Sequence, residues 1–433
     1  MALSGWKRAA LVLFLLYSAA HLVYSIQHYN PVTAPAVSGD FLRTYREASE
    51  LKSQWERTRG LSITQNDHLY HPLTYYVALW PLVGLGEKRV CLLLFLLQFI
   101  LFPWAIVLLV RSVARESVTW VEYALSFALA VNFHPFLETL AQHKTEGVEF
   151  FLICAAVYAL GRGREVGCGA LVCAAAGLKY LPAVLVLFFL IKRQTRVLLG
   201  FFGAALILLV LLAAVFGVPA IQPLLAHHVF RLLFSGEVQS NRQESYIEFQ
   251  SVSGAVKRWF SAVEPGQTFS NLLEAGSGRV VHPAAARFLS FLLQALLTVP
   301  FVWLTGSPWH VRREERRWPL YLLELSLGLT MLVVLIQAIR LHYAILLLPA
   351  YILTGLVLYR HRSEVPLRGK LLFGLAYLLG GIVIPAGLLR FLPASLVWGR
   401  LHFQVYLWTS GPVIGYLLLG VAILLCHKRL RTV

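Results

Sequence analysis

Asp40 is a carboxylate that closely follows the first long apolar run of the chain. It stands with Ser38 where an amphipathic helix is predicted to begin, because apolar residues then recur every three or four positions. This stripe consists of Phe41, Tyr45, Ala48, Leu51 and Trp55. We expect such a helix to lie in the membrane interface with its aromatic face toward the lipid. Asp40 could cap the helix, or it could accept a proton from an attacking hydroxyl group at the boundary between water and lipid.

Four cations could bind a phosphate group, namely Lys179, Lys257, Arg258 and Arg340. Arginine offers two parallel hydrogen bonds and lysine a point charge, and both suit a phosphate whose negative charge grows during a reaction. Lys179 could instead extend from a helix end toward water, and Lys257 and Arg258 could be solvated loop residues. Arg340 lies in a short loop on the side where cations are disfavoured, which favours a functional role.

Two histidines are further candidates. His342 could hydrogen-bond a phosphate or act as a second acid-base group, or its ring could bond a backbone carbonyl at a helix end. His71 precedes Pro72, so it could contact a substrate or merely cap the helix that follows. A metal site formed by Asp67, His68 and His71 has only weak support from their spacing. We therefore expect neither a metal nor another cofactor.

Other polar residues could contact a substrate. Gln142 and His143 could line a cavity or simply end a membrane span. Gln250 and Ser251 could contact a substrate or belong to an ordinary polar loop. The sequence alone leaves both interpretations of each pair open.

The composition indicates a polytopic membrane protein. Of the 433 residues, 58% are hydrophobic and only 14% are charged, unlike a soluble domain. The net charge of +17 comes mostly from short clusters between apolar runs, as in topology signals, so nucleic acid is not the expected partner. All five cysteines lie in apolar runs, which indicates neither disulfides nor a thiolate metal site.

Apolar runs of helical length define the expected architecture. They cover about 7–26, 89–111, 118–135, 146–161, 197–217, 284–306, 319–338, 342–359, 370–391 and 405–426. The run 166–191 is interrupted at Lys179, which predicts two short helices that meet there. Clusters of basic residues assign the cytoplasmic side, provided that 71–86 forms a juxtamembrane or re-entrant helix. The prediction is an all-α protein with about twelve spans and both termini inside.

Four stretches resemble glycosyltransferases of the GT-C superfamily and, more narrowly, glycosyltransferase family 87. They are "LYHPLTYYVALWPLVGL", "AAAGLKYLPAVLVLFFLIKRQ", "SYIEFQSVSGAVKRWF" and "RLHYAILLLPAYIL". Their order, and their expected position on one side of the membrane, carry the resemblance. The chain departs from the family pattern at Phe249 and Val252, where Asn and Leu are usual. It also departs at Ala141 and Lys144, where Gly and Asn are usual.

The resemblance implies one integral GT-C domain over 1–433. Its parts would be an N-terminal catalytic module, 1–217, with an outer loop at 27–88, a second outer loop at 218–283, and C-terminal helices from 284. It implies Asp40 as general base in an inverting, metal-independent transfer at the outer face of the plasma membrane. The donor would be a polyprenyl-phosphate-linked sugar, with mannose first among hexoses and pentoses. The acceptor would be a lipid or a glycan, and membrane lipids would surround the protein.

Other functions fit a chain of this kind. It could be a transporter or flippase of a lipid-linked or amphipathic solute, an enzyme resembling O-antigen ligases, or an inactive membrane scaffold. A transporter would place its polar residues in mid-span at the interface of repeated halves, and the sequence has no such repeat. The resemblance therefore favours the transferase.

Overall fold

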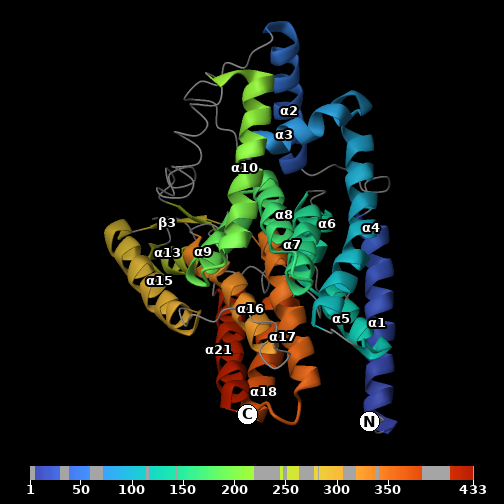
Figure 1. Ribbon diagram of the computed structural model, residues 1–433, viewed down its shortest axis with the longest axis vertical. Coiled ribbons are helices and arrows are strands. Elements are labelled where there is room, and N and C mark those ends of the chain that lie inside the picture. The colour runs from blue at the N-terminus through green and yellow to red at the C-terminus, as the bar shows by residue number, and fades with distance from the viewer. Residues whose placement is uncertain are drawn as a thin grey trace.

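A computed structural model describes most of the chain. It covers residues 5–29, 39–58, 72–113, 117–141, 145–218, 244–246, 251–262, 277–280, 282–305, 318–336, 341–382 and 410–432. Most of these residues are helical, and many of the long helices follow the long axis of the molecule (Figure 1). The all-α prediction is confirmed for this part of the chain, apart from one small sheet.

The N-terminal half is helical throughout its described parts. Its elements are α1 (Gly5–Tyr29), α2 (Gly39–Thr58), α3 (Leu73–Leu79), η1 (Trp80–Leu85), α4 (Glu87–Val113), α5 (Trp120–Val131), α6 (His134–Ala141), α7 (Glu146–Gly161), α8 (Glu165–Leu178), η2 (Leu181–Val184), α9 (Leu185–Ile191) and α10 (Thr195–Phe216). The predicted runs therefore match helices to within a few residues. The apolar run 166–191 is interrupted at Lys179, as predicted, because α8 ends one residue before it and η2 and α9 follow.

The C-terminal half adds a small sheet and further helices. The strands β1 (Glu244–Tyr246), β2 (Ser261–Ala262) and β3 (Ser277–Val280) are antiparallel in the order β1-β3-β2. The helices are α13 (Val252–Trp259), α15 (Pro283–Thr305), α16 (Trp318–Leu335), η5 (Leu341–Leu347), α17 (Leu348–Arg360), α18 (Leu367–Ala376), the π-helical η6 (Tyr377–Ile382) and α21 (Gly411–Thr432). The apolar runs of the sequence did not indicate this sheet, whose strands are only two to four residues long.

Several helices have the properties of membrane spans. Within the described residues, five are long and apolar enough to cross a bilayer: Glu87–Val113, Thr195–Phe216, Pro283–Trp303, Tyr343–Arg360 and Gly411–Arg431. Shorter apolar helices accompany them, and we conclude that the chain is a multi-pass membrane protein. The count of about twelve spans stays a prediction. The segment Leu73–Leu85 is too short to cross as one straight helix.

The two ends of the molecule differ in what they carry. Figure 1 shows both termini at one end and α2 and α3 at the other. Some of the segments that were predicted to be cytoplasmic contact one another. The indole of Trp318 donates a 2.7 Å hydrogen bond to the carbonyl of Ser112, and the hydroxyl of Tyr321 donates one of 3.0 Å to the Oε1 of Gln194. These contacts agree with the predicted grouping of the loops.

The apolar stripe of α2 is present as predicted, but the prediction that it faces lipid is wrong. Phe41, Tyr45, Ala48 and Leu51 are buried, and they pack against α3, the start of α4 and the end of α10 rather than lipid. The indole of Trp55 packs on that of Trp80, with ring centroids 5.5 Å apart. A helix whose apolar face covers protein leaves only its polar face for the surroundings. The position of α2 is therefore fixed by protein contacts.

Close contact between α8 and α10 requires two glycines. A Cβ atom on Gly169 would overlap the carbonyl oxygen of Val197, and one on Gly200 would overlap that of Val166. Small residues at such a crossing allow two backbones to approach closely within a membrane. Because α8 leads directly to Lys179, this crossing also sets the position of the chain break.

We predict that Gly169→Ala and Gly200→Ala each lower the free energy of unfolding by at least about 1–3 kcal/mol, because the added methyl group collides with backbone. Thermal unfolding of the purified protein in detergent measures the effect. Gly203→Ala is the matched control, since nothing lies within 4 Å of its Cβ position. Equal unfolding midpoints for all three variants would contradict the close crossing.

Candidate active site

A buried ion pair lies at the break in the apolar run. Lys179 directly follows α8, and its ammonium contacts the Oε1 atom of Glu146, the first residue of α7. The residues are only 5% and 1% exposed, respectively. A buried lysine requires a compensating charge, because desolvation of an isolated ammonium is very costly. Lys179 is therefore not a side chain that extends toward water.

Tyr343 adds a third element to this pair. The Nζ atom of Lys179 lies 4.0 Å from the centroid of the Tyr343 ring, a cation-π contact that brings in η5. His342 precedes Tyr343 directly in η5, and Arg340 immediately precedes that helix. The structure therefore brings Lys179 to the element that begins at the predicted Arg-Leu-His-Tyr sequence. This proximity was expected from the resemblance but not from the spacing of the residues.

Two consecutive tyrosines of α3 connect the ion pair with α2. The hydroxyl of Tyr76 donates a 2.6 Å hydrogen bond to the Oε2 of Glu47 in α2. Tyr75 is buried and interacts electrostatically with Glu146 and Lys179. Burial, and then the charge of Glu146, raise the pKa of Tyr75, so its phenol stays neutral. Adjacent residues on a helix face different directions, so α3 contacts α2 with one tyrosine and the ion pair with the other.

The contact of α3 with α8 lies beside the same break. The hydroxyl of Thr74 donates a hydrogen bond to the carbonyl of Gly177, two residues before Lys179. At Gly177 a Cβ atom would lie 3.3 Å from the Oγ1 of Thr74, so the glycine allows this approach. Through α3, the helix that begins at Gly39 and Asp40 is therefore joined to the chain break.

Three further predicted site residues, Ser251, Lys257 and Arg258, lie in α13 or directly before it. Ser251 caps this helix, since its Oγ accepts a 3.1 Å hydrogen bond from the amide of Gly254. Arg258 is 1% exposed and donates a 2.7 Å hydrogen bond from Nη2 to the Oγ of Ser410, which precedes α21. Burial lowers the pKa of Arg258 to about 9, which leaves the guanidinium charged at neutral pH.

Lys257 differs from its neighbour Arg258. It is half-buried, and burial followed by the nearby charge of Arg287 lowers its pKa. Neither residue of this pair is a freely solvated loop cation, which was the alternative interpretation of the sequence. Both belong to a helix that packs on α15 through Val256 and Ala286.

The remaining predicted site residues lie outside the described part of the structure. These are His71, Gln142, His143, Gln250 and Arg340. For Asp40 and His342 the backbone is helical, in α2 and η5, but the side chains also lie outside the described part. Their roles stay predictions.

Glu146 and Tyr75 were missed by the sequence analysis. The sequence does contain a signal for Glu146, because Glu146 and Glu149 are carboxylates three residues apart at the start of an apolar run. Acids in such a position usually face the protein interior and have a partner. Both are indeed buried. Nothing in the sequence identifies Lys179 as the partner of Glu146, because 33 residues separate them.

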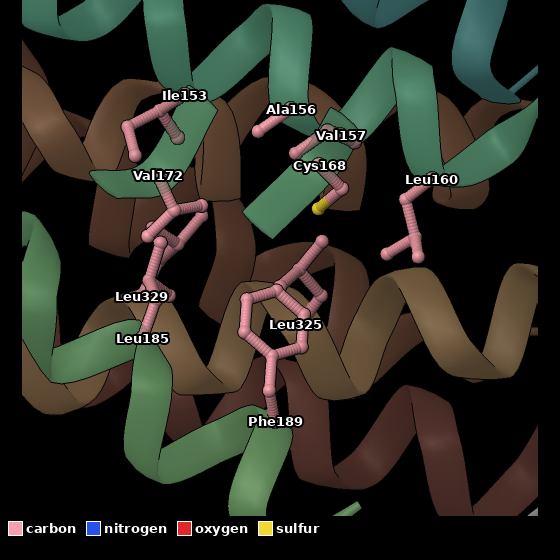
Figure 2. A pocket seen from close by; sticks show the side chains of 10 residues that line it. All are labelled: Ile153, Ala156, Val157, Leu160, Cys168, Val172, Leu185, Phe189, Leu325 and Leu329. Atoms are coloured by element: carbon pink, nitrogen blue, oxygen red, sulfur yellow. The ribbon is translucent and has the colours of Figure 1, made fainter. Parts of the chain in front are cut away.

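A cavity of about 10 Å³ lies between α7, α8, α9 and α16, and Figure 2 shows the side chains that point into it. Its lining is entirely apolar apart from the thiol of Cys168. A sugar or a phosphate needs hydrogen-bonding groups, and a site for either is much larger. We interpret this cavity as a small packing gap rather than a substrate site.

Together, the long apolar helices and the buried ion pair at a chain break define a multi-pass membrane protein with a polar centre. The sequence matches the family model of glycosyltransferase family 87 over residues 69–337. The chain therefore belongs to this family and is a membrane glycosyltransferase that acts on a sugar donor and an acceptor. No curated protein matches the chain. The matched residues include Lys179 and Arg258, whereas Asp40 and Arg340 lie outside them.

We predict that Lys179→Met lowers the free energy of unfolding by about 3–5 kcal/mol, because it removes the ammonium from a buried carboxylate. The double variant Lys179→Met/Glu146→Gln should recover part of this loss. Lys88→Met at the start of α4 is the control, since this lysine side chain is exposed and a surface charge contributes at most about 1 kcal/mol. Thermal unfolding in detergent compares the variants, and equal losses at both lysines would contradict the buried pair.

Proposed function

We propose that this enzyme transfers a hexosyl or pentosyl unit, mannose first among them, from a polyprenyl-phosphate-linked donor to a lipid or glycan acceptor. The reaction takes place at the outer face of the plasma membrane. The observation that carries the proposal is the link formed by α3. It contacts α2, which holds Asp40 in its first turn, and it also contacts the buried Lys179.

The chemistry requires a base on one side of the sugar and cations on the other. The Asp40 carboxylate accepts the proton of the acceptor hydroxyl, whose oxygen attacks the anomeric carbon. The bond from that carbon to the phosphate oxygen breaks, and polyprenyl phosphate leaves. A single in-line displacement inverts the anomeric configuration. No covalent enzyme intermediate is needed, and no metal or other cofactor takes part.

Charge on the phosphate grows as this bond breaks. In this proposal Lys179, Arg340, Lys257 and Arg258 stabilise the growing charge, and His342 donates a hydrogen bond to the same group. The cation-π contact of Lys179 with Tyr343 supports this assignment, because it brings η5, whose backbone includes His342, into contact with the lysine.

The remaining contacts belong to the sugar and the acceptor. His71, Gln142, His143, Gln250 and Ser251 are proposed to contact them. In the structure the hydroxyl of Ser251 caps α13, so a substrate contact would use its remaining hydrogen-bonding capacity.

We expect Asp40→Asn to lower kcat by about 10²–10⁴-fold, the usual contribution of a general base, with little change in donor KM. Transfer of radiolabelled sugar from a polyprenyl-phosphate donor by the purified enzyme measures this. Glu50→Gln, which removes a carboxylate from the exposed face of the same helix, should leave the rate unchanged. An unaltered rate with Asp40→Asn would remove Asp40 as the base.

The proposed face can be tested by labelling with a thiol reagent that does not cross membranes. Ser53 on α2 and Ser363 after α17 are both exposed, and all five native cysteines are buried. In intact cells Ser53→Cys should react, and Ser363→Cys should react only after the membrane is opened. The opposite pattern would place the site on the cytoplasmic side.

A further inference from the structure

Two buried carboxylates lie close to the single ammonium of Lys179. Glu146 contacts it directly, and Glu149, one helical turn further along α7, interacts with it electrostatically. Both are buried, and residues three apart lie on the same side of a helix.

Glu146 is held firmly in this position. It begins α7, and the next residue, Gly147, approaches α4 so closely that a Cβ atom would lie 2.8 Å from the Cγ of Gln98. The close approach of α7 to α4 therefore fixes the backbone beside the carboxylate. The Tyr343 ring lies on another part of the ammonium. A lysine confined in this way has few directions left for another oxygen atom.

The proposed reaction makes this charge balance important. A sugar phosphodiester carries one negative charge, whereas the phosphate monoester that leaves carries close to two at neutral pH. Cations that stabilise the transition state therefore bind the product more strongly than the donor. A fixed carboxylate beside one of these cations weakens the retention of the product.

We propose that Glu146 is a specificity-determining residue of the transfer reaction, which limits the negative charge that Lys179 accepts and so promotes release of the lipid phosphate. This role rests on the proposed function, because it requires a lipid phosphate near Lys179. The same role predicts discrimination against polyprenyl diphosphates, because the Glu146 and Glu149 carboxylates repel their additional negative charge.

Equilibrium binding to the full-length protein in lipid nanodiscs tests the proposal. The probes are a polyprenyl phosphate and a polyprenyl diphosphate of equal chain length. Wild type should bind the two with affinities within about threefold, whereas Glu146→Gln should tighten diphosphate binding about tenfold and phosphate binding less, since removing a nearby negative charge favours the more charged ligand most. Glu149→Gln should act in the same direction with a smaller effect.

Two comparisons show whether the effect acts through Lys179. The double variant Lys179→Met/Glu146→Gln should bind no more tightly than Lys179→Met, because the gain requires the ammonium. Glu122→Gln is the matched control, as it changes a buried glutamate that pairs with Arg360 and so joins α5 to the end of α17. Its affinities for both lipids should equal those of wild type.

The outcomes separate this inference from the proposed function. If wild type binds neither lipid, the proposed function fails. If wild type binds both and Glu146→Gln changes neither affinity, or weakens them, only the role of Glu146 is overturned. Should Glu146→Gln fail to fold, the ratio of the two wild-type affinities still tests the inference. A diphosphate affinity more than about tenfold above that for the phosphate would contradict the charge limit.

Discussion

Burial of a lysine in an apolar chain is the constraint on which the centre of this protein depends. Lys179 cannot lie within one straight helix in hydrocarbon, so the run breaks into α8 and the shorter η2 and α9. The buried ammonium then needs a carboxylate, which Glu146 supplies from α7. One charge therefore determines where a helix ends, where another begins and which elements meet.

The same constraint operates a second time at Lys192, with a different result. The ammonium of Lys192 lies 2.5 Å from the Oε2 of Glu324, whose Oε1 lies 3.0 Å from the Nε2 of His427. All three are buried, and they join the end of α9, α16 and α21. Between these polar groups the helices pack through apolar side chains and glycines. On their outer sides α10 and α15 expose large apolar residues, as expected for surfaces in contact with lipid.

The local features of this fold could be predicted, and the long-range ones could not. The apolar runs predicted the helices because bilayer thickness sets their length, and Lys179 predicted its own break because a charge in hydrocarbon is so costly. The stripe of α2 was also visible, yet its partner was not, since an apolar face packs equally well on lipid or protein. Pairs such as Lys179 with Glu146, or Arg258 with Ser410, join segments whose approach follows only from the complete packing.

The proposed base and the proposed phosphate-binding cations lie on different segments, which gives α3 a special position. Asp40 begins α2, and Lys179 ends the segment formed by α8, so no single helix fixes their separation. The short helix α3 contacts both segments through side chains. Tyr76 bonds Glu47 of α2, and Thr74 bonds the carbonyl of Gly177 in α8. The glycine crossing of α8 and α10 adds a close backbone contact on the lysine side. In the proposed mechanism, the distance between Asp40 and the leaving group therefore depends on the contacts of α3 with both segments.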